Sequence, residues 1–220
     1  MSQSATLRRP LPLVLADLIP GALVRDILLV VGAAGFVGAL AQVSIHLSFT
    51  PVPVTGQTLG VLLAGTALGW RRAAAAMALY AAAGVAGVPW FAGHTHGYAG
   101  ASFGYIVGFF LAAVLCGALA ERRADRSVLR SVPAMLAGEV AIYAAGLTWL
   151  ALDLHLGAGQ TISEGLTPFL AGDAIKAAIA AGLLPAAWRL AGRRPAHSPA
   201  PDSAPAKPEP EPGQAGVSPS

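Results

Sequence analysis

Two residues of opposite charge lie three positions apart in an apolar segment near the end of the chain. Asp173 and Lys176 belong to the sequence Pro168-Phe169-Leu170-Ala171-Gly172-Asp173-Ala174-Ile175-Lys176. A spacing of three places both side chains on one face of a helix. A carboxylate accepts hydrogen bonds from N–H groups, and an ammonium donates to carbonyl or carboxylate oxygens. The pair therefore has the chemistry to hold a small polar ligand that carries both donors and acceptors.

The apolar surroundings make this pair costly unless something compensates it. Insertion scales give a cost of about 2.5–3.5 kcal/mol for each charged side chain at the middle of a bilayer. Two charges on one helix face must therefore face an interior cavity or each other. Two interpretations follow, a ligand site or a structural pair that joins helices or lies near the headgroups. Residue chemistry favours the ligand site, since ionisable residues inside membranes are functional by default.

Three other residues offer chemistry in weaker patterns. Glu139 lies one or two helical turns after Pro133 in an apolar stretch. We expect its carboxylate to reach water and to act structurally or at the membrane interface rather than on a ligand. His94 and His96 form an H-x-H that could bind a metal ion. With no third ligand nearby, we expect a solvated loop and no metal site.

The sequence signatures of several enzymes are missing. Neither lysine follows a glycine, so the chain has no G-x-x-x-x-G-K-[ST] loop with which to bind ATP. It also has no G-x-S-x-G or H-E-x-x-H, the signatures of a serine hydrolase or a zinc protease. We therefore expect no catalytic residues, no cofactor in this chain and no enzyme activity. An ATP-driven role would need partner subunits.

The composition indicates which kind of structure positions the charged pair. Of the 220 residues, 55% are hydrophobic and 11% are charged, against roughly 25% charged in soluble proteins. The mean hydropathy is +0.63. The formal net charge of +3 does not indicate nucleic acid as a partner, because the arginines occur in short clusters between apolar runs. The expected class is an all-α polytopic membrane protein in a lipid bilayer.

Six transmembrane helices are expected from the charge-free runs. The 44 residues between Asp26 and Arg71 and the 48 between Arg72 and Glu121 carry no Asp, Glu, Lys or Arg. Each run is too long for one span of roughly 20 residues and contains turn-forming residues near its middle. Two further spans follow the basic loop after Glu121. The spans are expected near residues 28–45, 57–69, 73–90, 103–120, 133–152 and 167–190.

The positive-inside rule orients these spans. Thirteen of the fourteen Lys and Arg residues fall on one side of the expected membrane, and the other, Lys176, lies within the sixth span. Both termini are therefore expected in the cytoplasm of a plasma-membrane protein. We expect residues 1–27 to form a cytoplasmic or interfacial segment, residues 28–190 the membrane domain, and residues 191–220 a disordered cytoplasmic tail rich in Pro, Ala and Ser.

Small residues recur on the first span at helical spacing. Ala34 and Gly38 form one pair, and Gly35 and Ala39 form another. Such spacing lets a second helix approach closely. The approaching helix could belong to the same bundle or to a partner subunit, and the pattern alone does not distinguish these two possibilities.

Several segments carry a family resemblance. The segments that resemble the BioY family are Phe49-Thr50-Pro51-Val52-Pro53-Val54-Thr55-Gly56-Gln57-Thr58-Leu59-Gly60, Gly84-Val85-Ala86-Gly87-Val88-Pro89, Phe103-Gly104-Tyr105, Ile142-Tyr143 and the ending Gly172-Asp173-Ala174-Ile175-Lys176. Members of this family are the biotin-specific substrate-capture (S) components of energy-coupling-factor (ECF) transporters. The resemblance covers about residues 28–190, and the first and last motifs are specific in combination.

The resemblance implies a biotin site toward the outer side, capped by the loop between the first two spans. It assigns biotin binding to Asp173 and Lys176, in agreement with the two N–H donors and one carbonyl acceptor of the ureido ring. The motif segments add Thr55, Gln57, Tyr105 and Tyr143 as candidate substrate-binding residues. No Arg occurs on the outer side, so the carboxylate of biotin would use loop N–H groups, hydroxyls such as those of Tyr98 and Ser102, or Lys176.

The resemblance also implies partners. Gly35 and Ala39 would contact a transmembrane coupling subunit, which two ATPase subunits drive. Two alternatives to biotin uptake remain open from the residues alone. The chain could be an S component for another vitamin, or a membrane scaffold or enzyme that uses Asp173 and Lys176 as a structural or acid–base pair.

Overall fold

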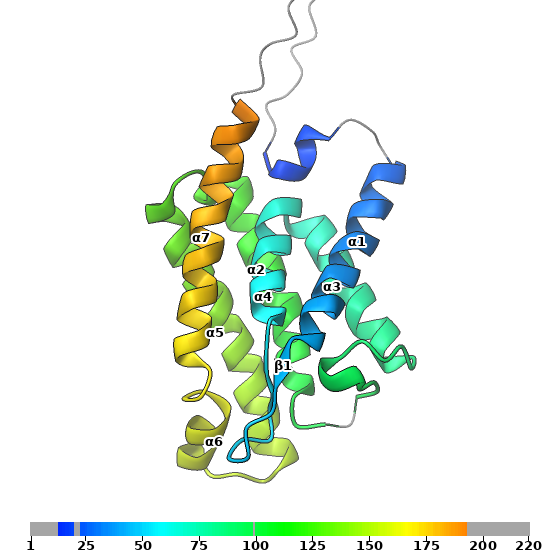
Figure 1. Cartoon of the computed structure of the whole chain (residues 1–220), viewed down its shortest axis with the longest axis vertical. Coiled ribbons are helices and arrows are strands. Elements are labelled where there is room, and N and C mark those ends of the chain that lie inside the picture. Colours follow the sequence, from blue (N-terminus) through cyan, green and yellow to red (C-terminus); the bar gives the residue numbers. More distant parts are fainter. Residues whose placement is uncertain (1–12, 20–22, 99, 193–220) are drawn as a thin grey trace, which may run out of the picture.

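The computed structural model describes residues 13–19, 23–98 and 100–192, and it is a bundle of helices (Figure 1). Most of the expected tail, residues 193–220, and much of the expected N-terminal segment lie outside the described residues. Three short 3-10 turns, η1 (Leu15–Leu18), η2 (Ala92–His94) and η3 (Ala124–Arg126), separate some of the helices. The helices are α1 (Leu23–Gln42), α2 (Gln57–Leu68), α3 (Trp70–Val85), α4 (Phe103–Glu121), α5 (Val128–Asp153), α6 (Ala158–Gly165) and α7 (Leu170–Gly192).

The six expected spans correspond in order to α1–α5 and α7, and α2 is as short as the second span expected near residues 57–69. Within the described residues four helices, α1, α4, α5 and α7, are long and apolar enough to cross a membrane. With 12 and 16 residues, α2 and α3 extend about 18 and 24 Å, less than the ~30 Å of a hydrocarbon core. Gly69, whose φ is +78°, ends α2 and starts α3 without a connecting loop. The count of six membrane-crossing helices is therefore not confirmed.

The connection before the last long helix also differs from the expectation. The stretch between the fifth and sixth expected spans contains the short helix α6, which was not expected. Thr161 fastens the start of α6, because its hydroxyl donates to the carbonyl of Gly157 at 3.0 Å.

Helix α4 lies at the centre of the bundle and packs against α2, α3 and α5. Helix α7 packs against α2 and α5, and α1 packs against α2 and α3. The close approach of α4 to α5 depends on Gly108, where a Cβ atom would lie 2.7 Å from the Cα of Ile142. Because Gly108 has no side chain, α5 packs close to α4 and shares the interior of the bundle with α2 and α7.

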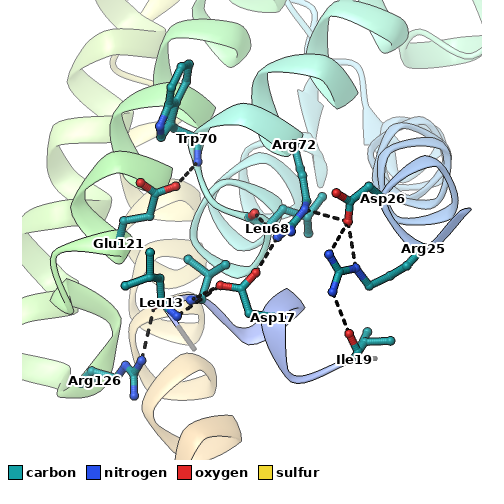
Figure 2. Close-up of polar contacts among 11 residues, drawn as sticks. Leu13, Asp17, Ile19, Arg25, Asp26, Leu68, Trp70, Arg72, Glu121 and Arg126 are labelled. Atoms are coloured by element: carbon teal, nitrogen blue, oxygen red, sulfur yellow. Dashed lines mark hydrogen bonds and ion pairs between the residues drawn. The ribbon is translucent and has the colours of Figure 1, made fainter. Parts of the chain in front are cut away.

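One end of the bundle collects the arginines, and we call it the basic end. It contains the start of α1, the α2–α3 corner, the α4–α5 connection and the end of α7 (Figure 1). Figure 2 shows how Arg72 joins two carboxylates there, with Nη1 2.9 Å from Asp17 and Nε 3.1 Å from Asp26. Burial raises the pKa of Asp17, but hydrogen bonds from Arg72 and from the N–H groups of Val14 and Leu13 outweigh it and hold that pKa below its usual value. The network fastens η1 across the corner between α2 and α3.

A second contact at the basic end fastens the α4–α5 connection to α7. The side chain of Asp125 in η3 is fully buried and accepts a hydrogen bond from the indole of Trp188. Burial raises the pKa of this carboxyl above its usual value. The guanidinium of Arg126 lies 3.3 Å from the centre of the Trp188 ring, a cation–π contact.

The opposite end of the bundle carries a small hairpin and α6 (Figure 1). Strands β1 (Ser44–Ile45) and β2 (Val54–Thr55) pair antiparallel, with Ser44 opposite Thr55. The hydroxyl of Thr50, in the loop between the strands, donates to the backbone carbonyl of Glu164 in α6 at 2.7 Å. This bond holds the hairpin over the ends of the helices that form the site.

Candidate functional site

Asp173 is the centre of a hydrogen-bonded cluster inside the bundle. Its Oδ1 accepts from the Nζ of Lys176 at 2.7 Å and from the hydroxyl of Thr58 at 3.1 Å. Its Oδ2 accepts from the hydroxyl of Tyr143. Asp173 is 5% exposed. We call these four residues the Asp173 cluster.

Three helices position the cluster. Asp173 and Lys176 lie one turn apart on α7, Thr58 lies in the first turn of α2, and Tyr143 lies on α5. The expected pairing on one face of the last helix is present as a direct ion pair. Asp173 also accepts hydrogen bonds from α2 and α5, so the pair joins α7 to both helices. The interpretation as a structural pair is therefore correct in part.

The cluster opens onto a cavity of about 50 Å³, which we call the inner cavity. Most of its wall is apolar, with Phe91, Phe109, Ile142 and Phe169 among the lining residues. The six residues expected to bind substrate all line it: Thr55, Gln57, Tyr105, Tyr143, Asp173 and Lys176. An apolar cavity with a few converging polar groups is the usual form of a small-molecule site.

Gln57 is the second polar group of this wall, and it is buried. Its Oε1 accepts from the hydroxyl of Thr55 at 3.0 Å, and its Nε2 donates to the hydroxyl of Tyr80 at 2.8 Å. The Tyr80 hydroxyl in turn donates to the carbonyl of Trp90 at 3.2 Å. A side-chain amide carries two N–H donors. One N–H of Gln57 donates to Tyr80, and the other is left to donate to a ligand.

Tyr105 contributes its ring to the cavity while its hydroxyl serves the fold. The hydroxyl donates to the carbonyl of Gly165 at 2.7 Å. The ring packs on α5 at Gly146, where any side chain would collide with it. Tyr105 therefore ties the end of α6 to the site, and its polar atom is already engaged.

A second cavity of about 230 Å³ adjoins the first and shares Pro53, Phe91, Ala92, Ser102 and Ile106 with it. We call it the outer cavity. The expected hydroxyl donors Tyr98 and Ser102 line it, as do His46 and His96. Across the described ranges, no group of three or more His, Cys, Asp or Glu side chains is placed to hold a metal ion.

Sequence reasoning missed Thr58 and misplaced Glu139. Thr58 directly follows Gln57 in the first family motif, and only the packing of α2 on α7 brings its hydroxyl to Asp173. The expectation that Glu139 reaches water is wrong, because its residue is 6% exposed. It lies on the inward face of α5 together with Gly138 and Ile142, which are also buried.

The two small-residue pairs of α1 face different surroundings. Ala34 and Gly38 are buried, and a Cβ at Gly38 would lie 3.3 Å from the ring of Trp90. Gly35 and Ala39 are exposed, and a Cβ at Gly35 would meet nothing within 4 Å. One pair therefore packs inside the bundle, and the other lies on its outer face.

The fold and the site together define a class of protein. Long apolar helices surround a buried ion pair that lines a cavity, an arrangement typical of a polytopic membrane protein. The chain belongs to the BioY family, whose model matches residues 6–193. BioY proteins are transporters, so the chain is a transport component and not an enzyme.

Named relatives agree with this assignment. The chain is 36% identical over 168 residues to the biotin transporter BioY of Rhizobium etli, covering 71% of this chain and 89% of the relative. It is 35% identical over 153 residues to the biotin transporter BioY of Thermotoga maritima, covering 67% and 89%.

A solved structure shares the fold. The crystal structure of the S-component for biotin from an ECF-type ABC transporter superposes with a TM-score of 0.69 at 22% identity, covering 76% of this chain and 92% of that chain. The arrangement of helices is thus that of an S component.

Proposed function

We propose that this protein binds biotin within the membrane and delivers it inward together with the coupling subunits of an ECF-type transporter. The observation that carries the proposal is the Asp173–Lys176 pair on the wall of an otherwise apolar cavity. A carboxylate and an ammonium side by side complement the ureido group, which offers two N–H donors and one carbonyl oxygen. The names of the relatives point to the same ligand.

Biotin in this site has its ureido ring at the Asp173 cluster. The ring N–H groups donate to Asp173, and the ring carbonyl accepts from Lys176. The apolar sulfur-containing ring fused to the ureido ring contacts Phe109 and Phe169. The pentanoate chain extends into the outer cavity, because the inner cavity alone is too small for the whole molecule. Ser102 and Tyr98 are the hydroxyl donors there for the carboxylate.

The proposed orientation places the basic end in the cytoplasm, as the positive-inside rule requires. All six main helices lie in the bilayer, with α2 and α3 as short members supported by α4. Both termini, including the tail from residue 191, are then cytoplasmic, and the hairpin and α6 face outward. The outer cavity is thus the entrance for biotin at the cell membrane.

The proposed partner surface is the outer face of α1 around Gly35 and Ala39. Both residues are exposed, and a Cβ at Gly35 would meet nothing within 4 Å, so a transmembrane helix of a coupling subunit can approach the α1 backbone there. This chain has no loop for ATP, so ATPase subunits supply the energy through the coupling subunit.

Equilibrium binding of labelled biotin to the purified full-length protein tests the ligand. We expect saturable binding at one site, competition by desthiobiotin, which keeps the ureido group, and no competition by lipoate, which keeps the pentanoate chain without it. We expect desthiobiotin to compete better than lipoate because the Asp173–Lys176 pair binds the ureido group, which lipoate lacks. Competition by lipoate as strong as by desthiobiotin would contradict the placement of the ureido group. Binding of another vitamin in place of biotin would support an S component with a different substrate.

Cysteine accessibility tests the orientation. In a Cys116→Ala background, His96→Cys in the exposed loop and Gly159→Cys in α6 are expected to react with an impermeant thiol reagent in intact cells. Leu129→Cys, 87% exposed beside Arg130 at the basic end, is expected to react only after permeabilisation. The reverse pattern would show that the basic end faces outward, against the positive-inside rule.

A further inference from the structure

One titratable group inside the bundle has no part in the site described above. Glu139 is 6% exposed, and neither of its carboxylate oxygens has a hydrogen-bond partner among the described residues. Asp173, which is equally buried, accepts three hydrogen bonds. An ionised carboxylate without donors is unfavourable in an apolar interior, and such a group takes up a proton instead.

Glu139 lies one helical turn from the Asp173 cluster, toward the basic end. It precedes Tyr143 by four residues on α5, so both side chains lie on one helix face. Helices α5 and α7 are packed neighbours that run in opposite directions (Figure 1). Because Tyr143 meets Asp173, the next turn brings Glu139 to the depth of Lys176. The charge of Glu139 interacts with those of both Asp173 and Lys176.

Titratable groups face Glu139 from three helices. They are Cys116 on α4, Tyr143 on α5, and Asp173 with Lys176 on α7. Helix α2, which also borders this region through Leu62, has no charged residue. Lys176 is thus the one cation of this set, and in this structure it pairs with Asp173.

Ligand binding competes for the acceptor sites of Asp173. Its two oxygens already accept from Lys176, Thr58 and Tyr143. Two incoming N–H donors need acceptor positions on the same carboxylate, which has about four in all. Lys176 is the donor that can move, since its ammonium lies at the end of a flexible four-carbon stem. An ammonium moved away from Asp173 needs another acceptor, because an unpaired charge in the interior is destabilising.

We propose that Glu139 is a proton-binding site linked to ligand binding. It holds a proton in the unliganded protein and releases that proton to the solution when the ligand displaces Lys176 from Asp173. Lys176 keeps its charge and donates both to the carbonyl of the ligand and to the carboxylate of Glu139. Asp173 also keeps its charge, with the two N–H groups of the ligand, Thr58 and Tyr143 as donors. The inference rests on the proposed binding of a ureido ligand.

The direction of the pH effect follows from this linkage. The complex binds one proton fewer than the free protein, so a higher pH favours binding. The dissociation constant for biotin should fall by up to tenfold for each unit of pH, as long as Glu139 of the free protein stays protonated. The effect ends once Glu139 is ionised in both states.

Titration calorimetry of biotin with the full-length protein tests the proposal. Measurements at one pH in buffers of different ionisation enthalpy give the number of protons released, and a series from about pH 6 to about 9 stays above the titration of biotin's own carboxyl. We expect up to one proton released per biotin in the wild type and none in Glu139→Gln. The Glu139→Gln protein should still bind biotin, with an affinity that no longer rises with pH.

Control variants separate Glu139 from other groups. Asp153→Asn removes an exposed acid from the same helix and should leave the proton count unchanged. Glu139→Asp keeps an acid and should keep proton release, which covers the case in which Glu139→Gln does not fold. His46 and His96 at the outer cavity are unchanged in all these proteins, so only the part of the pH effect that Glu139→Gln removes belongs to Glu139.

Three results would overturn the proposal. They are zero proton release in a wild type that binds biotin, equal release in Glu139→Gln, and a loss of release in Asp153→Asn. A fourth result, no biotin binding by the wild type at any pH, would overturn the proposed function and this inference with it. Infrared difference spectra give an independent readout, because a protonated carboxyl band should disappear when biotin is added to the wild type and should be missing from Glu139→Gln.

Discussion

Replacing either member of the ion pair is expected to weaken biotin binding by roughly ten- to a hundred-fold. Asp173→Asn keeps an acceptor oxygen but loses the charge, and Lys176→Met keeps the length of the side chain but loses every donor. Hydrogen bonds to charged groups contribute about 1.5–3 kcal/mol, which corresponds to this range of dissociation constants. Equilibrium binding of labelled biotin to the purified variants measures the effect.

The structure provides controls for this experiment. Each single replacement leaves the other charge unpaired in the interior, which can destabilise the fold by several kcal/mol. Thermal unfolding must therefore be followed beside affinity. The double variant Asp173→Asn/Lys176→Met removes both charges, so it should recover stability without recovering binding. Thr58→Val removes one neutral donor to Asp173 and keeps its shape, and it should cost less affinity than either charge. A well-folded Lys176→Met protein with unchanged affinity would leave the pair with a structural role alone.

The main elements of the site could be predicted from the sequence because they depend on local spacing. Asp173 and Lys176 are three residues apart on one helix, and helical geometry alone brings them onto one face. The bilayer cost made them candidates before any packing was known. The family motifs supplied Thr55, Gln57 and Tyr105, and all line the inner cavity with the pair.

What the sequence did not predict depends on the register between helices. Thr58 meets Asp173 only because α2 packs on α7 at a particular depth. Glu139 was expected near water because it lies only one or two helical turns after Pro133, near the expected start of its span. However, α5 starts at Val128, so Glu139 lies about three turns into the helix, where it faces inward. Distance along the chain from a charged loop is thus a poor measure of burial when the helix begins earlier than expected.

The lengths of α2 and α3 show a second limit. The second span was expected near residues 57–69, which is short for a crossing, and hydropathy does not distinguish a short supported helix from a complete crossing. The break is made by one residue, Gly69, whose positive φ lets the chain reverse without a loop. Arg72 just after it is held by Asp17 and Asp26, so the corner is fixed by contacts that no local pattern encodes.

The structure distinguishes the two small-residue pairs of α1, which the sequence alone did not. Both small-residue pairs have the spacing of a close helix–helix contact, yet Gly38 packs on Trp90 and Gly35 meets nothing. The bundle therefore explains the first pair and leaves the second without a role inside the chain. A face of small residues within a membrane helix is where another helix can come closest, since van der Waals packing drives association there.

Gly35→Leu and Ala39→Leu are therefore expected to reduce biotin uptake by cells by roughly tenfold or more, the effect of about 1.4 kcal/mol lost from docking on the coupling subunit. Biotin binding by the purified variants should stay within about twofold of the wild type, because the new side chains point away from the bundle. Gly182→Leu is the matched control, since this exposed glycine of α7 also has no neighbour within 4 Å of its Cβ position. It should transport normally.

Co-purification of the coupling subunit should fall with uptake for the α1 variants alone. Equal losses of binding and uptake would show that the α1 face supports the fold of the subunit, and equal losses of uptake in Gly182→Leu would show that bulk anywhere on the lipid-facing surface is harmful.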